Sequence, residues 1–316
     1  MMRRLWVGQF LGVLLCALAA VAQAPSEVTY EPDVVYGRVG DMDLKMNLAK
    51  PAGTPHGAIV CMHGGAWQLG DKASYEGIVR RLAEGGYVAA AVGYRLAPAH
   101  QWPAQIEDVK CAVRYLRAHA KELNIDPDKI GALGDSAGGH LALLAGLMDP
   151  KDDLEGTGGY ADQSSKVNAV VNLYAPTDIS AWVVPPETQE QVLRDMGKSS
   201  DQFLIDWLGT ADRTADVMKQ ASPVTYVSAG DPPVLTFHGD KDNLVPIAQA
   251  EVLQAALEKA NIPHRFVVMK DHVHGWDLLT SMPEALAFFD AVLNGKPIPQ
   301  DPVAAPTEPK AGPAEK

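Results

Sequence analysis

Six short apolar runs, separated by longer segments, constrain the fold of this chain more than any other feature. The runs cover residues 58–62, 87–92, 129–133, 169–174, 234–238 and 265–269. Their nearly continuous hydrophobicity is typical of strands buried on both faces of a parallel sheet. The segments 103–123 and 247–260 between them carry apolar residues at helical spacing. This alternation predicts an α/β fold, a doubly wound, mostly parallel sheet with helices on both faces.

Three further segments fall outside this alternation. Residues 34–48, with Gly40 and Asp41 in the middle, predict an antiparallel hairpin that extends one edge of the sheet. Residues 149–166 and about 179–227 read as insertions, which we expect above the carboxyl ends of the strands, where ligands bind. The second insertion has helical segments but no strand and predicts a lid. The acidic residues of the first do not have the spacing of a calcium loop, which favours a solvated turn.

The two ends of the chain differ from its body. Arg3 and Arg4 precede an apolar run at 10–22 and small residues suited to signal peptidase, so we expect a secretory signal peptide over 1–22, cleaved after Ala22. The alternative is an uncleaved anchor, for which the apolar stretch is short. Residues 296–316 are rich in proline and predict a flexible tail. We therefore expect one domain over 28–294 and a secreted or periplasmic location.

Composition excludes several function classes. The chain has 27 Lys and Arg against 39 Asp and Glu, a formal net charge of −12. Such a chain is repelled by nucleic acid and lacks the basic patches that dock on anionic lipid, so neither a nucleic acid nor an obligate membrane partner is expected. Cys61 and Cys111 lie in no CxxC motif or Cys/His cluster, which leaves a zinc site unsupported and favours two buried, unpaired thiols.

The motif GDSAGG at 134–139 lies directly after a predicted strand and directly before a helical run. A serine on so tight a strand-to-helix turn needs glycine on both sides, because larger residues would block the turn and the approach of a substrate. The motif predicts Ser136 as a nucleophile. The N–H group of Ala137, at the start of the helix, is then placed to stabilise an oxyanion.

The motif HGGAW follows the strand 58–62. Its small residues allow the N–H groups of Gly64, Gly65 and Ala66 to point at one place, which predicts the other half of an oxyanion hole. His63 is a possible base, but a histidine here is expected to brace the loop. Trp67 either lines a substrate pocket or packs under the lid, and the sequence leaves both open.

A serine nucleophile needs a base and a carboxylate that orients the base, and in α/β proteins these follow the serine in the order acid, then histidine. The loop after the strand 234–238 offers Asp242, with Asp240 as the rival, whose position after a glycine suits loop bracing. The loop after the strand 265–269 offers His274, with His272 as the rival. We predict Asp242 as the acid and His274 as the base.

The remaining histidines carry no functional prediction. His140 follows the serine motif on the helix, where we expect it to pack or cap. We expect surface positions for the others, which are His56, His100, His119 and His264.

Six motifs in a fixed order resemble one superfamily. They are HGGAW, VGYRLAP, GDSAGGH, LYAPTD, HGDKDNLVP and HVHGW. The chain resembles the α/β hydrolases over about 34–294, and is most similar to the esterase group of hormone-sensitive-lipase-like enzymes and bacterial bifunctional carbohydrate and feruloyl esterases. The resemblance implies a triad of Ser136, Asp242 and His274, with oxyanion donors at 64–66 and Ala137.

The chain departs from the lipase-like pattern in two ways. Ala66 stands where that branch usually has a third glycine, which favours the carbohydrate-esterase branch. No long cap precedes the hairpin, so the lid is expected to shape most of the pocket.

These observations predict a secreted serine carboxylesterase that uses an acyl-enzyme on Ser136 and needs no metal or organic cofactor. The expected substrates are short acyl esters, such as acetyl or feruloyl groups on plant polysaccharide, with Trp67 and Trp276 in the pocket. The alternatives are a lipase-like esterase on small lipid or polymer esters, a serine peptidase of the same fold, and a non-catalytic binding protein. Inert amides would separate an esterase from the peptidase, and an idle Ser136 would identify the binding protein.

Overall fold

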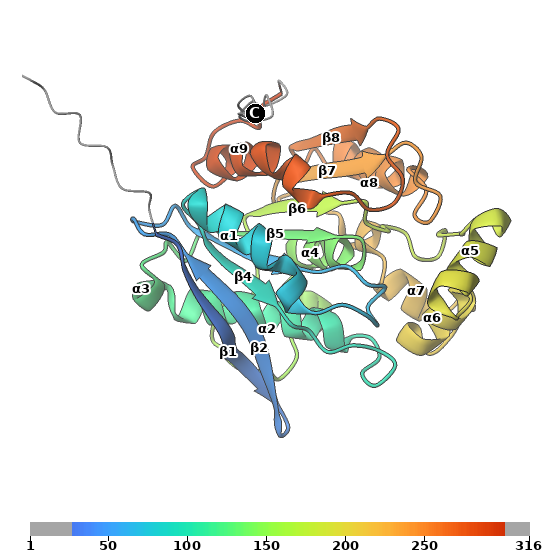
Figure 1. Ribbon diagram of the computed structural model, residues 1–316, viewed down its shortest axis with the longest axis horizontal. Coiled ribbons are helices and arrows are strands. Elements are labelled where there is room, and N and C mark those ends of the chain that lie inside the picture. The colour runs from blue at the N-terminus through green and yellow to red at the C-terminus, as the bar shows by residue number, and fades with distance from the viewer. Residues whose placement is uncertain (1–26, 301–316) are drawn as a thin grey trace, which may run out of the picture.

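An eight-stranded sheet organises the computed structural model, which describes residues 27–300 (Figure 1). The strands are β1 (Thr29–Val39), β2 (Met42–Lys50), β3 (Ala58–Met62), β4 (Val88–Val92), β5 (Ile130–Asp135), β6 (Ala169–Leu173), β7 (Val234–Gly239) and β8 (His264–Met269). Their order is β1-β2-β4-β3-β5-β6-β7-β8. The pairs β1·β2 and β2·β4 are antiparallel and all the others are parallel.

The predicted fold class is confirmed, because the six apolar runs form the parallel strands and the hairpin extends the sheet through β2. The central strands β3 and β4 are buried at every residue, as expected of strands covered on both faces. The predicted signal peptide at 1–22 and most of the proline-rich tail lie outside the described residues.

Helices cover both faces of the sheet. One face packs against α1 (Glu76–Glu84) and α9 (Met282–Val292). The other packs against α2 (Ala104–Ala118), α4 (Ala137–Leu147) and α8 (Ala248–Lys259). Every residue of α4 is buried, because sheet, neighbouring helices and lid surround it. The sheet therefore separates two apolar cores and presents its loops at its ends.

The helix expected over 103–123 is interrupted. It ends at Ala118, and a short helix α3 (Ala120–Leu123) follows. The chain leaves regular helical geometry at His119, with φ −98° and ψ 16°. The His119 ring and backbone N–H both bond the carbonyl of Tyr115, and this local capping ends the helix.

The insertion at 149–166, which contains η2 (Pro150–Asp152), does not lie above the carboxyl ends of the strands, so that expectation is wrong. It connects the end of α4 to the beginning of β6, and such a connection starts at the opposite edge of a parallel sheet. From there it runs along α2 to β1, where the Arg38 N–H donates to the Gly158 carbonyl at 2.9 Å. No residue of this insertion lines the large pocket described below.

The acidic residues of this insertion are only partly a solvated turn. Asp149 forms ion pairs with Lys151 and Lys166 at the surface. Glu155 instead pairs with the buried cations Lys110 and Arg114, at 2.9 and 2.8 Å. A buried cation needs such a partner, so Glu155 fastens the insertion to α2.

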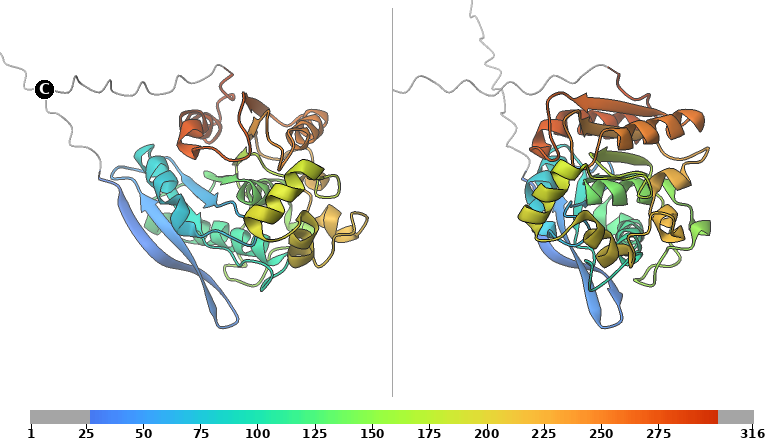
Figure 2. Two further views of the ribbon diagram at one scale, coloured as in Figure 1. Left: turned by 45° about the vertical axis from the view of Figure 1, so that its right-hand side comes forward. Right: turned by 90° about the vertical axis from the view of Figure 1, so that its right-hand side faces the viewer.

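The second insertion forms a helical lid beside the carboxyl ends of the parallel strands (Figures 1 and 2). It contains α5 (Pro186–Met196), α6 (Ser200–Leu208), α7 (Asp216–Gln220) and η3 (Pro223–Tyr226). The indole of Trp207 on α6 is fully buried and stacks on Trp67 with ring centroids 3.5 Å apart. The lid is thus packed onto the loop that follows β3.

Cys61 on β3 and Cys111 on α2 are buried free thiols, as predicted. Across residues 27–300 no helix has the length and apolar character needed to span a bilayer. In the same range no cluster of three His, Cys, Asp or Glu side chains is arranged to hold a metal ion.

Candidate active site

Ser136 lies on a strained turn between β5 and α4, with φ 49° and ψ −119°. The turn is held against β3 so closely that a Cβ on Gly138 would collide with the Met62 carbonyl. A Cβ on Gly134 would collide with the Gly138 carbonyl in the same way. Both glycines are therefore required by close backbone approach, and the serine is left at the end of the strand facing the lid.

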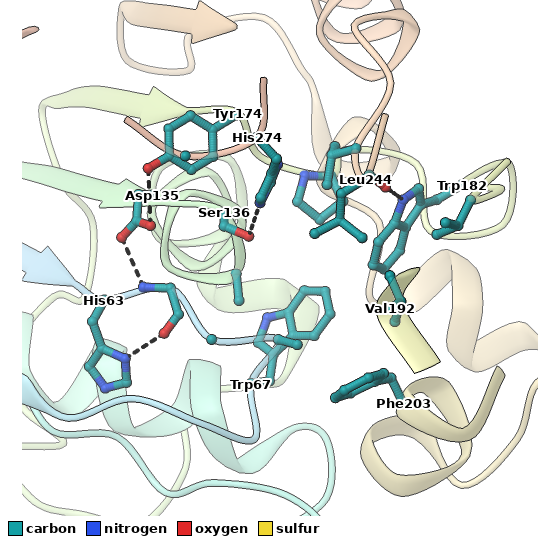
Figure 3. Close-up of a pocket in the computed structure, with 18 of the residues that line it drawn as sticks. His63, Trp67, Asp135, Ser136, Tyr174, Trp182, Val192, Phe203, Leu244 and His274 are labelled. Carbon is teal, nitrogen blue, oxygen red and sulfur yellow. Dashed lines mark hydrogen bonds between the residues drawn. The ribbon is translucent and has the colours of Figure 1, made fainter. Parts of the chain in front are cut away.

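The structure brings Ser136, His274 and Asp242 together in one hydrogen-bonded chain (Figure 3 shows its serine and histidine). The Ser136 Oγ lies 3.0 Å from the His274 Nε2. The His274 Nδ1 lies 2.7 Å from the Asp242 Oδ2. With its proton on Nδ1, the imidazole donates to the carboxylate and offers Nε2 as an acceptor to the serine hydroxyl.

Asp242 is held in place from several sides. Its Oδ1 accepts the backbone N–H groups of Leu244 and Val245 at 3.0 and 2.8 Å. Burial alone would raise the pKa of this carboxyl, but the N–H groups of His238, His274 and Val245 stabilise its anion and hold the pKa below the ordinary value. Asp242 is therefore an ionised carboxylate in a nearly dry loop, which suits it to offset positive charge on His274.

Two loops supply backbone N–H groups near the serine. Ala137 is the first residue of α4, so its N–H has no acceptor within the helix. Among the described residues, Gly65 and Ala66 donate their N–H groups to no protein acceptor. Gly64 differs, because its N–H donates to the Asp135 Oδ1 at 2.8 Å. The expectation that Gly64 is an oxyanion donor is therefore wrong in this structure, while Gly65, Ala66 and Ala137 remain candidates.

Asp135, which precedes the serine, is a residue that the sequence reasoning missed. Its Oδ1 accepts both the Gly64 N–H and the Tyr75 hydroxyl, the latter at 2.5 Å. Its Oδ2 accepts the Tyr174 hydroxyl at 3.3 Å (Figure 3). The Tyr174 ring also packs edge-on against His274, with centroids 4.8 Å apart. One carboxylate thus joins the turn of Ser136 to the oxyanion loop, residues 63–67 after β3. Through Tyr174 the same carboxylate is also linked to the base His274. Asp135 and Tyr174 lie within quoted motifs, whereas no motif contained Tyr75.

A cavity of about 510 Å³ opens above these groups and has mainly apolar walls. Trp67 and Trp276, the two residues predicted for the pocket, both line it. Trp67 also packs beneath the lid, so both of its proposed roles apply. The lid contributes Trp182, Val184, Val192, Ser200 and Phe203. The Trp182 indole is fixed by a 2.9 Å hydrogen bond to the Leu244 carbonyl, close to the acid (Figure 3).

The rival histidines and carboxylate have other contacts. His63 is buried and its ring N–H bonds the Gly64 carbonyl at 2.7 Å, in the bracing role expected. His272 is half-buried and its ring N–H bonds the Lys270 carbonyl. The Asp240 Oδ1 accepts the Asp271 N–H at 2.6 Å, which braces the loop that carries His274. None of the three touches Ser136.

His140 is buried beneath the lid and links it to the oxyanion loop. The Trp67 indole N–H donates to the His140 Nδ1 at 3.2 Å, and the His140 Nε2–H donates to the Ala221 carbonyl at 2.6 Å. The bond from Trp67 requires a neutral ring, because the His140 Nδ1 can accept only when it carries no proton. Burial lowers the pKa of His140 to about 4, so this requirement is met at neutral pH.

Comparisons with known proteins agree with this geometry. The BD-FAE family model matches residues 42–257. The chain is 31% identical to the probable carboxylic ester hydrolase LipM of Mycobacterium tuberculosis, over 78% of this chain and 55% of LipM. It is 32% identical to esterase LipC of the same organism, over 71% of this chain and 54% of LipC. The chain thus spans about half the length of these curated relatives.

Solved structures show the same relationship. A truncated carbohydrate esterase from gut microbiota superposes with a TM-score of 0.70 at 28% identity, covering 86% of this chain and 99% of that one. The propionate-bound esterase Est2 of Thermogutta terrifontis superposes with a TM-score of 0.62 at 30% identity, covering 81% and 86%. The family model spans more than half of this chain. The chain therefore belongs to the BD-FAE family, with the α/β hydrolase fold of hormone-sensitive-lipase-like carboxylesterases.

Proposed function

We propose that this protein is a serine esterase that hydrolyses carboxylic esters through an acyl-enzyme on Ser136. The observation that carries the proposal is the hydrogen-bonded chain from Ser136 through His274 to Asp242, at the floor of an apolar cavity. His274 Nε2 takes the hydroxyl proton as the Ser136 Oγ attacks the ester carbonyl. The negative oxygen of the tetrahedral intermediate then accepts N–H groups from Ala137 and the 65–66 segment.

The intermediate collapses in a step that His274 also serves. The imidazolium gives its proton to the leaving alcohol, the C–O bond breaks, and the acyl group stays on Ser136. Water then loses a proton to His274 and attacks the acyl-enzyme, which releases the acid and restores the serine hydroxyl. Asp242 keeps the imidazole oriented and balances its charge in both halves.

We propose short acyl esters as the substrates, with acetyl or feruloyl groups on carbohydrate as the first choice. The cavity volume lies within the range of small-molecule sites, and its apolar walls suit an uncharged acyl group better than an ionic one. Two similar structures are described as a carbohydrate esterase and as an esterase with bound propionate, which fits this size class.

We also propose export from the cytoplasm, on the grounds of the N-terminal sequence alone. Expression of the full chain followed by N-terminal sequencing of the exported protein tests this, with Gln23 expected as the first residue. An unprocessed, membrane-bound product would support the uncleaved anchor instead.

The test of the activity is a series of p-nitrophenyl esters from acetate to long acyl chains, with methyl ferulate, acetylated xylan and a peptide amide. We expect turnover of short esters or of the polysaccharide, inert amides, and a loss of about 10⁵-fold or more in kcat for Ser136→Ala. Amide cleavage without ester cleavage would favour a peptidase. Equal turnover by the wild type and Ser136→Ala would contradict the mechanism.

A further inference from the structure

His238, on β7, is a buried titratable group that the mechanism above does not use. Its side chain has no solvent exposure and does not line the cavity above Ser136. Its Nε2 lies 2.7 Å from the carbonyl oxygen of Val245 and therefore carries a proton. In the described part of the chain its Nδ1 is buried without a hydrogen-bond partner. The polar contacts of the ring are therefore made by Nε2, which faces the acid loop, the segment between β7 and α8 that carries Asp242.

The contacts of His238 form a closed ring with the acid loop. The Val245 N–H donates to the Asp242 Oδ1 at 2.8 Å, while the Val245 carbonyl accepts from His238. The His238 Nε2 also lies 3.5 Å from the Asp242 Oδ2, the same oxygen that contacts the His274 Nδ1 at 2.7 Å. This carboxylate oxygen is therefore placed between two imidazoles, one at the substrate cavity and one in the core.

The strand that carries His238 is a rigid support. β7 is hydrogen-bonded to β6 on one side and to β8 on the other, and His238 pairs in register with Val268. The acid loop between β7 and α8 has no such neighbours on both sides. Its first residues are held by backbone bonds from Asp240 and Lys241 to the carbonyls of Met269 and His272, and its Leu244 carbonyl accepts the Trp182 indole. Around Asp242 itself the loop is held by the turn bonds to Leu244 and Val245 and by the His238 contact with the Val245 carbonyl.

We propose that His238 is a positioning residue that holds Asp242 Oδ2 toward His274. The inference rests on the proposed function, because it assigns His238 a part in the same catalytic chain. The titratable groups that face this arrangement are His274 and, across the base, Tyr174, while the nearby Asp240 is turned to the Asp271 amide. Loss of the His238 N–H should let the carboxylate swing away and leave the His274 imidazolium with a weaker partner.

Two polar variants test this proposal. His238→Gln places an amide N–H at about the position of the imidazole Nε2–H, whereas the side chain of His238→Asn is too short to reach the Val245 carbonyl. We expect the Gln variant to keep kcat within threefold and the Asn variant to lose at least tenfold in kcat, with KM changed by less than threefold. His264→Asn is the matched control, because His264 lies on β8 and contacts the Ile262 carbonyl and the Glu258 carboxylate, neither of which belongs to the catalytic chain.

A second readout does not depend on activity. The NMR signal of the proton on the His274 Nδ1 reports its hydrogen bond to Asp242. It should move upfield in His238→Asn, because a weaker hydrogen bond deshields the proton less, and stay at its wild-type position in His238→Gln. An unchanged signal in the Asn variant would overturn the positioning role, as would equal kcat values for the two variants.

The two readouts also separate the two proposals. If the wild type hydrolyses no ester while the His274 Nδ1 proton signal still moves in His238→Asn, the proposed function fails and the positioning of Asp242 stands. If the Asn variant does not fold, the Gln variant decides, because the proposal requires it to keep both kcat and the position of the His274 Nδ1 proton signal.

Discussion

The floor and the wall of the cavity are built in different ways. The floor consists of the strand-end loops that carry Ser136, Asp242 and His274, and each of these side chains is fixed by hydrogen bonds or a strained turn. The wall is the lid surface, where the side chains of Val192 and Phe203 contribute only apolar contact. We therefore infer that the strand-end loops carry out the chemistry and that the lid governs substrate preference. Changes in the floor should alter kcat, and changes in the wall should alter substrate preference.

The largest effect expected at the floor comes from Asp242→Asn. The amide keeps the shape but favours the wrong His274 tautomer and cannot balance the imidazolium, so kcat should fall by about 10⁴-fold with little change in KM. Steady-state kinetics on a short p-nitrophenyl ester measures this. Asp240→Asn is the matched control and should stay within about threefold. A larger loss for Asp240→Asn would exchange the roles of the two carboxylates.

His140 joins the wall to the floor through its bonds to Ala221 and Trp67. Its protonation should change the free energy of unfolding rather than the rate of catalysis. His140 has a pKa of about 4 in the folded protein against about 6.5 unfolded. Between these values the unfolded chain binds the extra proton, so the stability from this group is complete above pH 6.5 and is lost as the pH falls toward 4. The full contribution is about 3 kcal/mol.

Urea unfolding at pH 7.5 and at pH 5 measures this contribution. His140→Gln, whose amide N–H can still donate to the Ala221 carbonyl but which does not titrate, should show a flatter stability profile than the wild type. Identical pH dependence in the two proteins would assign the effect to other groups.

A smaller effect is expected from Tyr75→Phe, which tests how the floor is held together. The change removes one donor from Asp135 while leaving the Gly64 N–H in place, so the oxyanion loop loses part of its support. We expect kcat to fall by about tenfold, in keeping with the loss of one hydrogen bond to a carboxylate. Tyr87→Phe is the control, because its hydroxyl bonds Asp290 far from the site. Equal losses for both would indicate a general effect on stability.

The smallest change in rate should come from the wall. Val192 faces the cavity and Leu193 beside it is exposed, so Val192→Phe narrows the pocket while Leu193→Phe does not. We expect Val192→Phe to change kcat/KM on acetate by less than threefold and to lower it several-fold on octanoate. The ester series measures the profile. An unchanged profile would show that acyl groups bind away from α5.

The fold and the triad could be predicted from sequence because both depend on local patterns in a fixed order. The apolar runs gave strands within two residues of the observed bounds, and the loops after them held Ser136, Asp242 and His274. Parallel strands bring their carboxyl ends to one edge, so residues up to 138 positions apart meet without any further information.

The misses depend on contacts that no local pattern encodes. The Gly64 N–H is not available to an oxyanion, because it donates to Asp135, which follows 71 positions later in the sequence. The first insertion lies at the opposite edge because it connects the end of α4 to the start of β6, a topology that its own sequence does not encode. The lid anchor formed by Trp207 on Trp67 arises from packing between distant helices and loops.

The two buried thiols give this protein an internal reporter of its folding. Burial raises the pKa of the Cys61 thiol strongly and that of Cys111 to about 11, so neither forms the reactive thiolate at neutral pH while the domain is folded. In a Cys16→Ser background, alkylation of either thiol would therefore require the chain to open. Because Cys61 lies in the centre of the sheet and Cys111 beneath the hairpin at its edge, pulse alkylation with mass spectrometry would distinguish global unfolding from detachment of the edge.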